Sequence, residues 1–242
     1  MWAHGLPACA IVAAVTTVIA HRGASKAFPE NTVAAFRGAL AMGADMVELD
    51  VRRTADGALA IHHDAHLADG RAICEVASAD LPSDIPSLRE AIDACGQMGV
   101  NVEVKSSSRD PDFDPTRSVA ADVARLVGQR DLYDRILVSS FDVGSISRVR
   151  EVDAKVGTAW LTMVVPDAAA VVASLVESGH RALHPHDQIV DAALVDACHA
   201  SGIEVNVWTV DDPARMTELV ALGVDGICTN VPDVALGVLG RR

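Results

Sequence analysis

The chain has 242 residues, half of them hydrophobic, which excludes wholesale disorder and allows one barrel-sized domain or two small domains. Its formal net charge of −13 argues against nonspecific binding to nucleic acid or to anionic membranes. An anionic substrate would therefore need a locally positive pocket, and we expect a metal ion there. Aromatic residues make up only 3% of the chain, so aliphatic side chains must fill most of the core.

The first twenty residues contain an apolar run, 8–20, that resembles the core of a signal peptide. No basic segment precedes the run, and it is too short to span a bilayer. It leads directly into the motif His21-Arg22-Gly23. We therefore interpret 16–20 as a first buried strand and predict that residues 1–15 are an N-terminal extension of unknown role.

From residue 16 onward, short β-branched runs alternate with amphipathic, alanine-rich stretches, a pattern typical of repeated βα units and a parallel sheet. Eight strands are predicted, at 16–20, 46–51, 101–104, 135–138, 156–161, 181–183, 203–207 and 226–228. Neither GxGxxG nor GxxxxGK[ST] is present, which removes the usual nucleotide sites of open-sheet folds. The sequence therefore predicts an α/β fold, an eight-stranded β/α (TIM) barrel, as one domain over 16–242.

Two of the predicted helices have clear start signals. One spans 32–42 with Asn31 as its cap, and the other spans 87–97, after Pro86, with Glu90 in capping-box position. Glycines are expected to end several helices, at Gly43, Gly99, Gly202 and Gly223.

In such a barrel the active site is built at the carboxyl ends of the strands. The first predicted strand ends in His21-Arg22, and the second carries Glu48 and Asp50 on one face, because side chains alternate along a strand. The third repeats this arrangement. Its Glu103 and Lys105 follow the same spacing. Three oxygen ligands suit Mg²⁺ or Ca²⁺, although either segment alone also fits an ordinary strand with one solvated face.

Further candidates follow other strands and one turn. Phe141, His184 and Trp208 come at the ends of later strands, and His63 follows a predicted turn at Asp56-Gly57. Two histidines near neutral pH can activate a nucleophile and protonate a leaving oxygen, as phosphodiester hydrolysis requires. We expect Arg22 and Lys105 to neutralise phosphate oxygens, and the neighbouring His62 and His66 to be surface residues.

Ten motifs, in order from about His21 to Asp233, resemble the signature of the glycerophosphodiester phosphodiesterases. They are His21-Arg22-Gly23, Pro29-Glu30-Asn31-Thr32, Glu48-Leu49-Asp50-Val51, Asp56-Gly57, His63-Asp64, Ile85-Pro86-Ser87-Leu88-Arg89-Glu90, Asn101-Val102-Glu103-Val104-Lys105, Ser139-Ser140-Phe141-Asp142, Val207-Trp208-Thr209-Val210 and Gly223-Val224-Asp225-Gly226. Each motif alone is weak, but the ordered set is specific.

The resemblance implies a TIM barrel of the phospholipase-C-like phosphodiesterase type that hydrolyses glycerophosphodiesters to sn-glycerol 3-phosphate and an alcohol. It implies an acid–base pair, His21 and His63, and a divalent cation, Mg²⁺ or Ca²⁺. The remaining roles are metal ligands (Glu48, Asp50 and Glu103), phosphate binding (Arg22 and Lys105) and a pocket near the alcohol (Phe141 and Trp208). For Phe141 and Trp208, ordinary packing at the barrel rim is an alternative. The partner is a small-molecule glycerophosphodiester, with no nucleic acid and no stable membrane insertion.

One departure concerns the insertion that commonly caps the active site in this family. Only a short segment, around 65–85, follows His63-Asp64, and no helical run stands out in it, so a more open pocket is expected. One alternative is an enzyme similar to phospholipase D or sphingomyelinase D, or a lysophospholipase D, acting on a lipid phosphodiester. Another is an inactive barrel that serves as a binding module. The leaving alcohol, the attacking group and a homo-oligomeric state stay open.

The five cysteines are scattered and never spaced as CxxC, namely Cys9, Cys74, Cys95, Cys198 and Cys228. This pattern predicts neither a disulfide framework nor a zinc site. A reducing cytoplasm is the simplest setting, and we predict a cytoplasmic protein.

Overall fold

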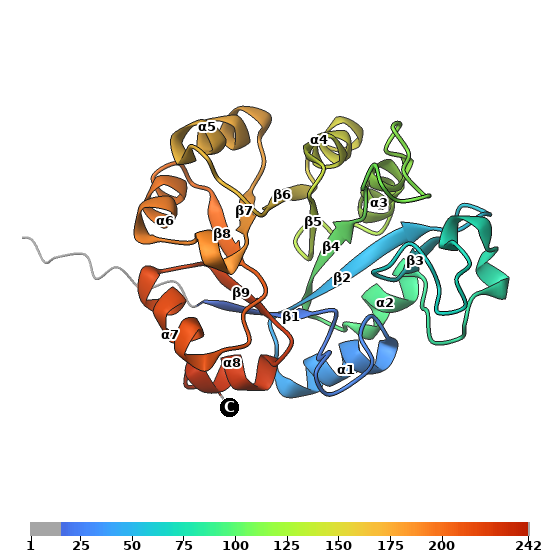
Figure 1. Ribbon diagram of the computed structural model, residues 1–242, viewed down its shortest axis with the longest axis horizontal. Coiled ribbons are helices and arrows are strands. Elements are labelled where there is room, and N and C mark those ends of the chain that lie inside the picture. Colours follow the sequence, from blue (N-terminus) through green and yellow to red (C-terminus); the bar gives the residue numbers. More distant parts are fainter. Residues whose placement is uncertain (1–15, 242) are drawn as a thin grey trace, which may run out of the picture.

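A computed structural model describes residues 16–241, so the predicted extension 1–15 lies outside the described residues. Eight parallel strands form a closed barrel, because β1 pairs with β2 on one side and with β9 on the other (Figure 1). The strands are β1 Thr17–His21, β2 Met46–Arg53, β4 Gly99–Val104, β5 Ile136–Ser140, β6 Gly157–Thr162, β7 Ala182–Pro185, β8 Glu204–Val207 and β9 Gly226–Thr229. The predicted barrel and its eight strands are confirmed, with ends displaced by at most two residues.

Helices surround the barrel (Figure 1). They are α1 Val33–Met42, α2 Leu88–Ala94, α3 Ser118–Gln129, α4 Val143–Val152, α5 Ala168–Ser178, α6 Ala192–His199, α7 Pro213–Leu222 and α8 Pro232–Val238. A short strand that the sequence did not predict, β3 Leu59–Ile61, pairs antiparallel with the end of β2. None of the helices within 16–241 is long and apolar enough to cross a lipid bilayer.

The helix boundaries follow local capping chemistry, with corrections to the predicted ones. The capping box at α2 is confirmed, since the Ser87 side chain accepts from the backbone N–H of Glu90 and the Glu90 side chain accepts from that of Ser87. At α1 the prediction was wrong by one residue, because Thr32 is the cap. Asn31 instead adopts a left-handed conformation, with φ of 57°, that turns its amide toward the barrel interior.

Glycines end α1 and α7 as predicted. Gly43 and Gly223 both have φ above 80° and close their helices in left-handed conformation. Gly99 was wrongly predicted to end a helix, since it is the first residue of β4. The helix α2 ends earlier, with Cys95 as its C-cap, and α6 likewise has Ala200 as its C-cap, two residues before Gly202.

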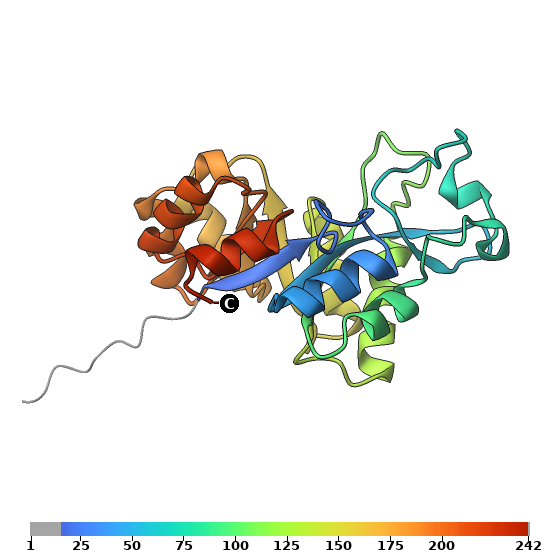
Figure 2. The ribbon, with the colours of Figure 1, turned by 90° about the horizontal axis from the view of Figure 1, so that it is seen from below.

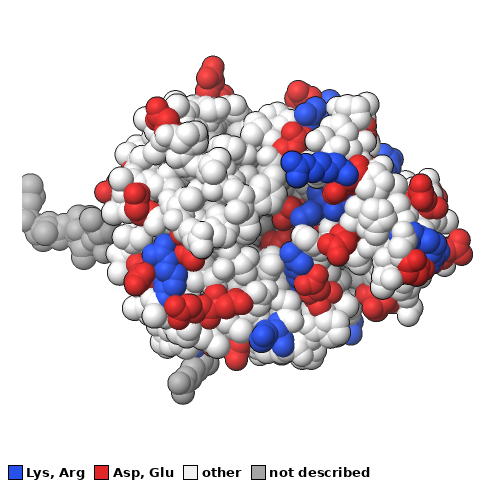
Figure 3. Space-filling model, viewed as in Figure 1, with Lys and Arg blue, Asp and Glu red and all other residues white. Residues whose placement is uncertain are grey.

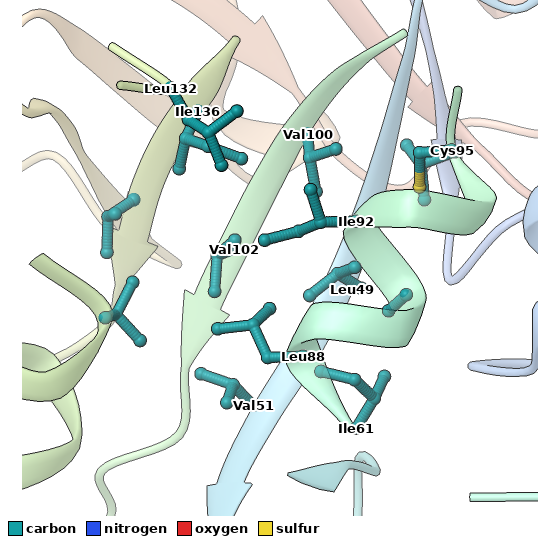
Figure 4. Close-up of a cluster of buried hydrophobic side chains, with 14 of the residues drawn as sticks. Leu49, Val51, Ile61, Leu88, Ile92, Cys95, Val100, Val102, Leu132 and Ile136 are labelled. Carbon is teal, nitrogen blue, oxygen red and sulfur yellow. The ribbon is translucent and has the colours of Figure 1, made fainter. Parts of the chain in front are cut away.

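The core lies between the barrel and its ring of helices. Leu49 and Val51 of β2 and Val100 and Val102 of β4 point outward and pack beneath α2 (Figure 4). Because side chains alternate along a strand, the polar residues between them point into the barrel. The same alternation that builds the core therefore places the carboxylates of β2 and β4 inside.

The segment between His63 and α2 has little regular structure. It contains two single 3₁₀ turns, Ile73–Glu75 and Ser78–Asp80, and a small apolar cluster of Leu67, Ile73 and Val76. Figure 2 shows this segment rising on the same side of the molecule as the loop between β4 and α3. Two segments that α2 and β4 separate in the sequence thus lie on the same side beside the barrel mouth.

Candidate active site

Three carboxylates meet at the carboxyl end of β2 and β4. Glu48, Asp50 and Glu103 each offer a ligand oxygen, and these oxygens all lie within 4.8 Å of one another. Asp50 and Glu103 are direct partners in the parallel register of the two strands. All three side chains are buried, with Asp50 only 1% exposed. The structure therefore brings together the three residues predicted as metal ligands.

Burial and mutual repulsion oppose full ionisation of this cluster. Burial raises the pKa of Glu48 well above its usual range, and the nearby charges of Asp50 and Glu103 add to the effect. Burial also raises the pKa of Glu103. For Asp50 burial acts in the same direction, but Lys105 and Arg22 outweigh it and lower the pKa. Such a crowded set of carboxylates is stabilised by positive charge.

The donor set fits a hard divalent cation. Among residues 16–241, the buried Oε1 of Glu48 has no hydrogen-bond partner, and the buried Oδ1 of Asp50 has no hydrogen bond but faces the Lys105 ammonium at 3.3 Å. Buried polar atoms without partners are uncommon in proteins and need an explanation. Carboxylate oxygens in this number suit Mg²⁺ or Ca²⁺ better than softer metals.

Two cations lie against the same carboxylates. The Lys105 ammonium is 2.7 Å from Oε1 of Glu103 and 3.3 Å from Oδ1 of Asp50. Nε of Arg22 lies 3.2 Å from Oδ2 of Asp50, and the Arg22 backbone N–H donates to Oε2 of Glu48 at 2.9 Å. Arg22 and Lys105 therefore lie beside the carboxylate cluster, where they could contact an anionic group of a bound substrate.

The two predicted histidines flank the cluster, each with one ring nitrogen hydrogen-bonded. Nδ1 of His21 lies 2.8 Å from Oδ1 of Asn230, and Nδ1 of His63 lies 2.7 Å from Oδ1 of Asp64. Nε2 of His21 is 3.9 Å from Oε2 of Glu48. Burial lowers the pKa of both imidazoles below the ordinary histidine value, which favours neutral rings near pH 7.

A cavity of about 120 Å³ occupies the barrel mouth. Eight of the nine predicted site residues line it, the exception being the deeper Asp50. Phe141 and Trp208 form one wall, with ring centroids 5.4 Å apart in an edge-to-face arrangement. Figure 3 shows acidic and basic side chains meeting in the central hollow of this face. His63 lines the cavity and His62 does not, as the alignment of the His-Asp motif predicted.

Three polar residues that support the site were not predicted. Asn31 donates to Oδ2 of Asp50 at 2.8 Å, Asn230 holds His21, and the buried Arg52 donates to the backbone carbonyl of His63 at 2.9 Å. Asn230 comes directly after β9. Active-site residues of such a barrel are expected at the carboxyl ends of the strands, so the position of Asn230 could have indicated it. Arg52 offers no such signal, because the carboxylates that it binds, Asp110 and Asp112, lie in a loop far along the chain.

Comparison with known proteins gives a consistent result. A family model described as the glycerophosphoryl diester phosphodiesterase family matches residues 21–234. A glycerophosphodiester phosphodiesterase of Caldanaerobacter subterraneus subsp. tengcongensis is 30% identical over 255 residues, covering 93% of this chain and 98% of that protein. One from Bacillus altitudinis is also 30% identical, over 249 residues, with 93% of this chain and 98% of that protein covered.

Solved structures share the barrel. A putative glycerophosphoryl diester phosphodiesterase from Silicibacter pomeroyi superposes with a TM-score of 0.84 at 27% identity, covering 93% of each chain. An Oleispira antarctica phosphodiesterase in complex with the product sn-glycerol-3-phosphate gives 0.83 at 25% identity, covering 93% of this chain and 97% of that one. The resemblance read from the ordered motifs is thus confirmed, and this chain belongs to the glycerophosphoryl diester phosphodiesterase family of phosphoric diester hydrolases.

Proposed function

We propose that this enzyme hydrolyses glycerophosphodiesters to sn-glycerol 3-phosphate and an alcohol, using a divalent cation and an acid–base pair of histidines. The observation that carries the proposal is the cluster of Glu48, Asp50 and Glu103, with ligand oxygens within 4.8 Å of one another, between two histidines and two cations. The family and the product bound to the Oleispira antarctica relative support the choice of substrate.

The three carboxylates are proposed to hold Mg²⁺ or Ca²⁺. When bound, such an ion supplies positive charge that stabilises the charge developing on the phosphoryl oxygens. Arg22 and Lys105 contribute in the same way from the protein, Arg22 as a planar fork and Lys105 as a point charge. Their present contacts with Asp50 and Glu103 keep both cations directed at the cavity.

His21 and His63 are proposed to move the protons. One imidazole takes a proton from the attacking water or substrate hydroxyl as the oxygen of that group bonds to phosphorus. The other, in its protonated form, gives a proton from Nε2 to the oxygen of the departing alcohol as the phosphorus–oxygen bond breaks, and it becomes neutral. The Nδ1 hydrogen bonds to Asn230 and Asp64 support these roles, because they orient both rings and leave each Nε2 for the substrate.

A second candidate function is the hydrolysis of a lipid phosphodiester such as a lysophospholipid. It is favoured by exposed apolar side chains that follow β5 and β6, namely Phe141, Met163 and Val164 in the loops and Val143 at the start of α4. Phe141 also lines the cavity, so an apolar group of a bound substrate would have a surface to lie against. A rat lysophospholipase D is 24% identical over 268 residues.

The proposal extends to the organisation and setting of the chain. We infer one barrel domain over 16–242, supported by the pairing of β1 with β9 from the far end of the sequence, preceded by an extension at 1–15. A cytoplasmic location is supported by the described cysteines, all four of which are free thiols. A small-molecule diester remains the expected partner.

The test is a hydrolysis panel with controlled metal content. Enzyme stripped by exhaustive chelation is assayed with glycerophosphocholine, glycerophosphoethanolamine, glycerophosphoglycerol and a lysophospholipid, before and after addition of Mg²⁺, Ca²⁺ or Mn²⁺. We expect activity only with added metal, and its loss in Glu48→Gln but not in the surface variant Glu75→Gln. Full activity after chelation would refute metal dependence, and turnover of the lysophospholipid alone would favour the second candidate.

A further inference from the structure

The hydrogen bond between His21 and Asn230 shows which ring nitrogen of His21 carries the hydrogen, once the orientation of the Asn230 amide is known. Oδ1 of Asn230 lies 2.8 Å from Nδ1 of His21. The oxygen and nitrogen of an amide have nearly the same shape, so the surrounding hydrogen bonds must decide which of them faces the ring.

Asp211 decides this orientation. Its Oδ2 accepts from the Asn230 side-chain nitrogen at 2.7 Å, and its Oδ1 accepts from the Asn230 backbone N–H at 2.8 Å. The Thr229 hydroxyl donates to the same Oδ1 at 2.9 Å, which fixes the carboxylate. A reversed amide would bring the oxygen of Asn230 against an oxygen of Asp211, two acceptors with no hydrogen between them. The amide oxygen therefore faces His21.

We propose that Asp211 and Asn230 are positioning residues that hold neutral His21 with its hydrogen on Nδ1, so that Nε2 is the atom that exchanges a proton. An amide oxygen can only accept a hydrogen bond, so Nδ1 must donate. The lone pair then belongs to Nε2, the nitrogen 3.9 Å from Oε2 of Glu48. The inference rests on the proposed acid–base role of His21, and it adds two residues and a defined tautomer to that role.

Ser25 contacts the same amide oxygen but does not determine its direction. Its hydroxyl lies 2.9 Å from Oδ1 of Asn230. A hydroxyl can donate or accept, so this contact would tolerate either amide orientation. Asp211, which can only accept when ionised, is thus the residue on which the tautomer depends. This difference separates the expected effects of changing the two residues.

The first experiment reads the tautomer directly. Imidazole ¹⁵N–¹H correlation spectra of histidine-labelled enzyme at pH 8 distinguish a protonated from an unprotonated ring nitrogen, and His21→Gln assigns the resonance. We expect the His21 hydrogen on Nδ1 in the unmodified enzyme, and a mixture of tautomers in Asp211→Asn, whose amide can also donate to Asn230. A hydrogen on Nε2 of His21 in the unmodified enzyme would overturn the inference.

The second experiment measures the consequence for turnover. Asp211→Asn should lower kcat by about 10- to 100-fold with little change in KM, because the proton-exchanging nitrogen is affected and substrate binding is not. Asp212→Asn is the matched control, since Asp212 only caps α7 and asparagine caps equally well. Asn230→Ala should lower kcat by a similar factor, whereas Ser25→Ala should not.

These outcomes also separate this inference from the acid–base proposal. If His21→Gln keeps full activity, the acid–base role fails, whereas the spectra still report the tautomer. If His21→Gln is inactive but folded Asp211→Asn and Asn230→Ala both keep kcat within about twofold, the positioning role is wrong. A selective fall in kcat together with a changed tautomer supports it.

Discussion

Asn31 and Asp50 are joined by two hydrogen bonds, one from the Asn31 amide to Oδ2 of Asp50 at 2.8 Å and one from the Asp50 backbone N–H to Oδ1 of Asn31 at 3.3 Å. Both residues are buried. The neutral amide of Asn31 thus binds Oδ2 of Asp50. The other oxygen, Oδ1, faces Lys105 and the other two carboxylates. Asn31 therefore orients a proposed metal ligand from a position outside the ligand set.

Replacing Asn31 should weaken metal binding. Asn31→Gly keeps the left-handed conformation accessible but removes both hydrogen bonds, and loss of such an outer-shell partner typically costs about 10- to 100-fold in metal affinity. Calorimetric titration of the stripped enzyme with Mg²⁺, Ca²⁺ and Mn²⁺ measures the change. Thr32→Ser, which retains a capping hydroxyl at α1, is the control. Unaltered affinity in folded Asn31→Gly would contradict the orienting role.

Substitution of the two cavity histidines should abolish most of the turnover. His21→Ala and His63→Ala should each lower kcat by about 10² to 10⁴, the usual contribution of a general acid or base. His62→Ala and His66→Ala should have little effect, because neither residue lines the cavity. Steady-state kinetics on glycerophosphocholine with saturating metal tests all four variants. Greater damage from His62→Ala than from His63→Ala would mean that the role has been given to the wrong histidine.

Arg52 and Arg53 are neighbours whose replacement should have very different effects on stability. Nη1 of the buried Arg52 donates to both carboxylate oxygens of Asp112, at 2.9 and 2.7 Å, and its Nη2 donates to Asp110 at 3.0 Å. Its removal leaves the largely buried Asp112 without its partner, which costs about 3–5 kcal/mol. Arg53 is partly exposed and pairs with Asp122 at 3.4 Å, a contact worth about 0–1 kcal/mol.

Urea unfolding of Arg52→Ala and Arg53→Ala compares these two expectations. The first variant should have a clearly lower free energy of unfolding, and the second should stay close to the unmodified protein. Because Arg52 also holds the His63 backbone carbonyl, Arg52→Ala should lose activity at temperatures where it is still folded. Equal stability losses in the two variants would show that the buried ion pair of Arg52 with Asp112 contributes no more than the exposed pair of Arg53 with Asp122.

Most of the barrel and the polar face of β2 could be predicted from the sequence, because side chains alternate along a strand. Alternation along β2 places Glu48 and Asp50 on one face regardless of where the strand begins or ends, so small boundary errors do no harm. Similar alternation on β4 adds Glu103. The three residues of β3, by contrast, are too few to show a period, and that strand was missed.

The supporting residues were harder to predict because their partners depend on the fold. Asn31 and Thr32 are adjacent, and both residue types favour helix caps, so only the observed turn shows which one caps and which one binds Asp50. Arg52 and Asp112 are separated by 60 positions, in a strand and an irregular loop. Nothing in local spacing links such a pair.

The stability of the enzyme should fall in acid partly through His180. Burial and the nearby Arg150 lower the pKa of His180 to about 4, and its Nδ1 is hydrogen-bonded to Thr158 at 2.8 Å. In the unfolded chain the imidazole regains its ordinary value of 6.5 and binds a proton first. Stability linked to His180 is therefore complete above pH 6.5 and is lost as the pH falls toward 4, by at most about 3 kcal/mol.

Urea unfolding at several pH values, for the unmodified protein and for His180→Asn, measures this dependence. Asparagine keeps a polar atom near Nδ1 but does not titrate, so the variant should lose less stability between pH 6.5 and 4. His66→Asn, at an exposed position, is the control and should retain the original slope. Parallel curves for His180→Asn and the unmodified protein would show that His180 is already protonated in the fold.

Selectivity among leaving alcohols should be modest. The proposed phosphate-binding residues, Arg22 and Lys105, lie beside β1 and β4, whereas the short segment after His63 provides only 3₁₀ turns and a small apolar cluster. Because few contacts reach the distal alcohol, the differences in kcat/KM among diesters should be small, whereas kcat/KM for the best diester should be lowered less. We expect kcat/KM for choline, ethanolamine, glycerol and inositol diesters to lie within about a hundredfold, roughly 3 kcal/mol. A larger preference for one diester would show that loops after β5 and β6 form a selective pocket.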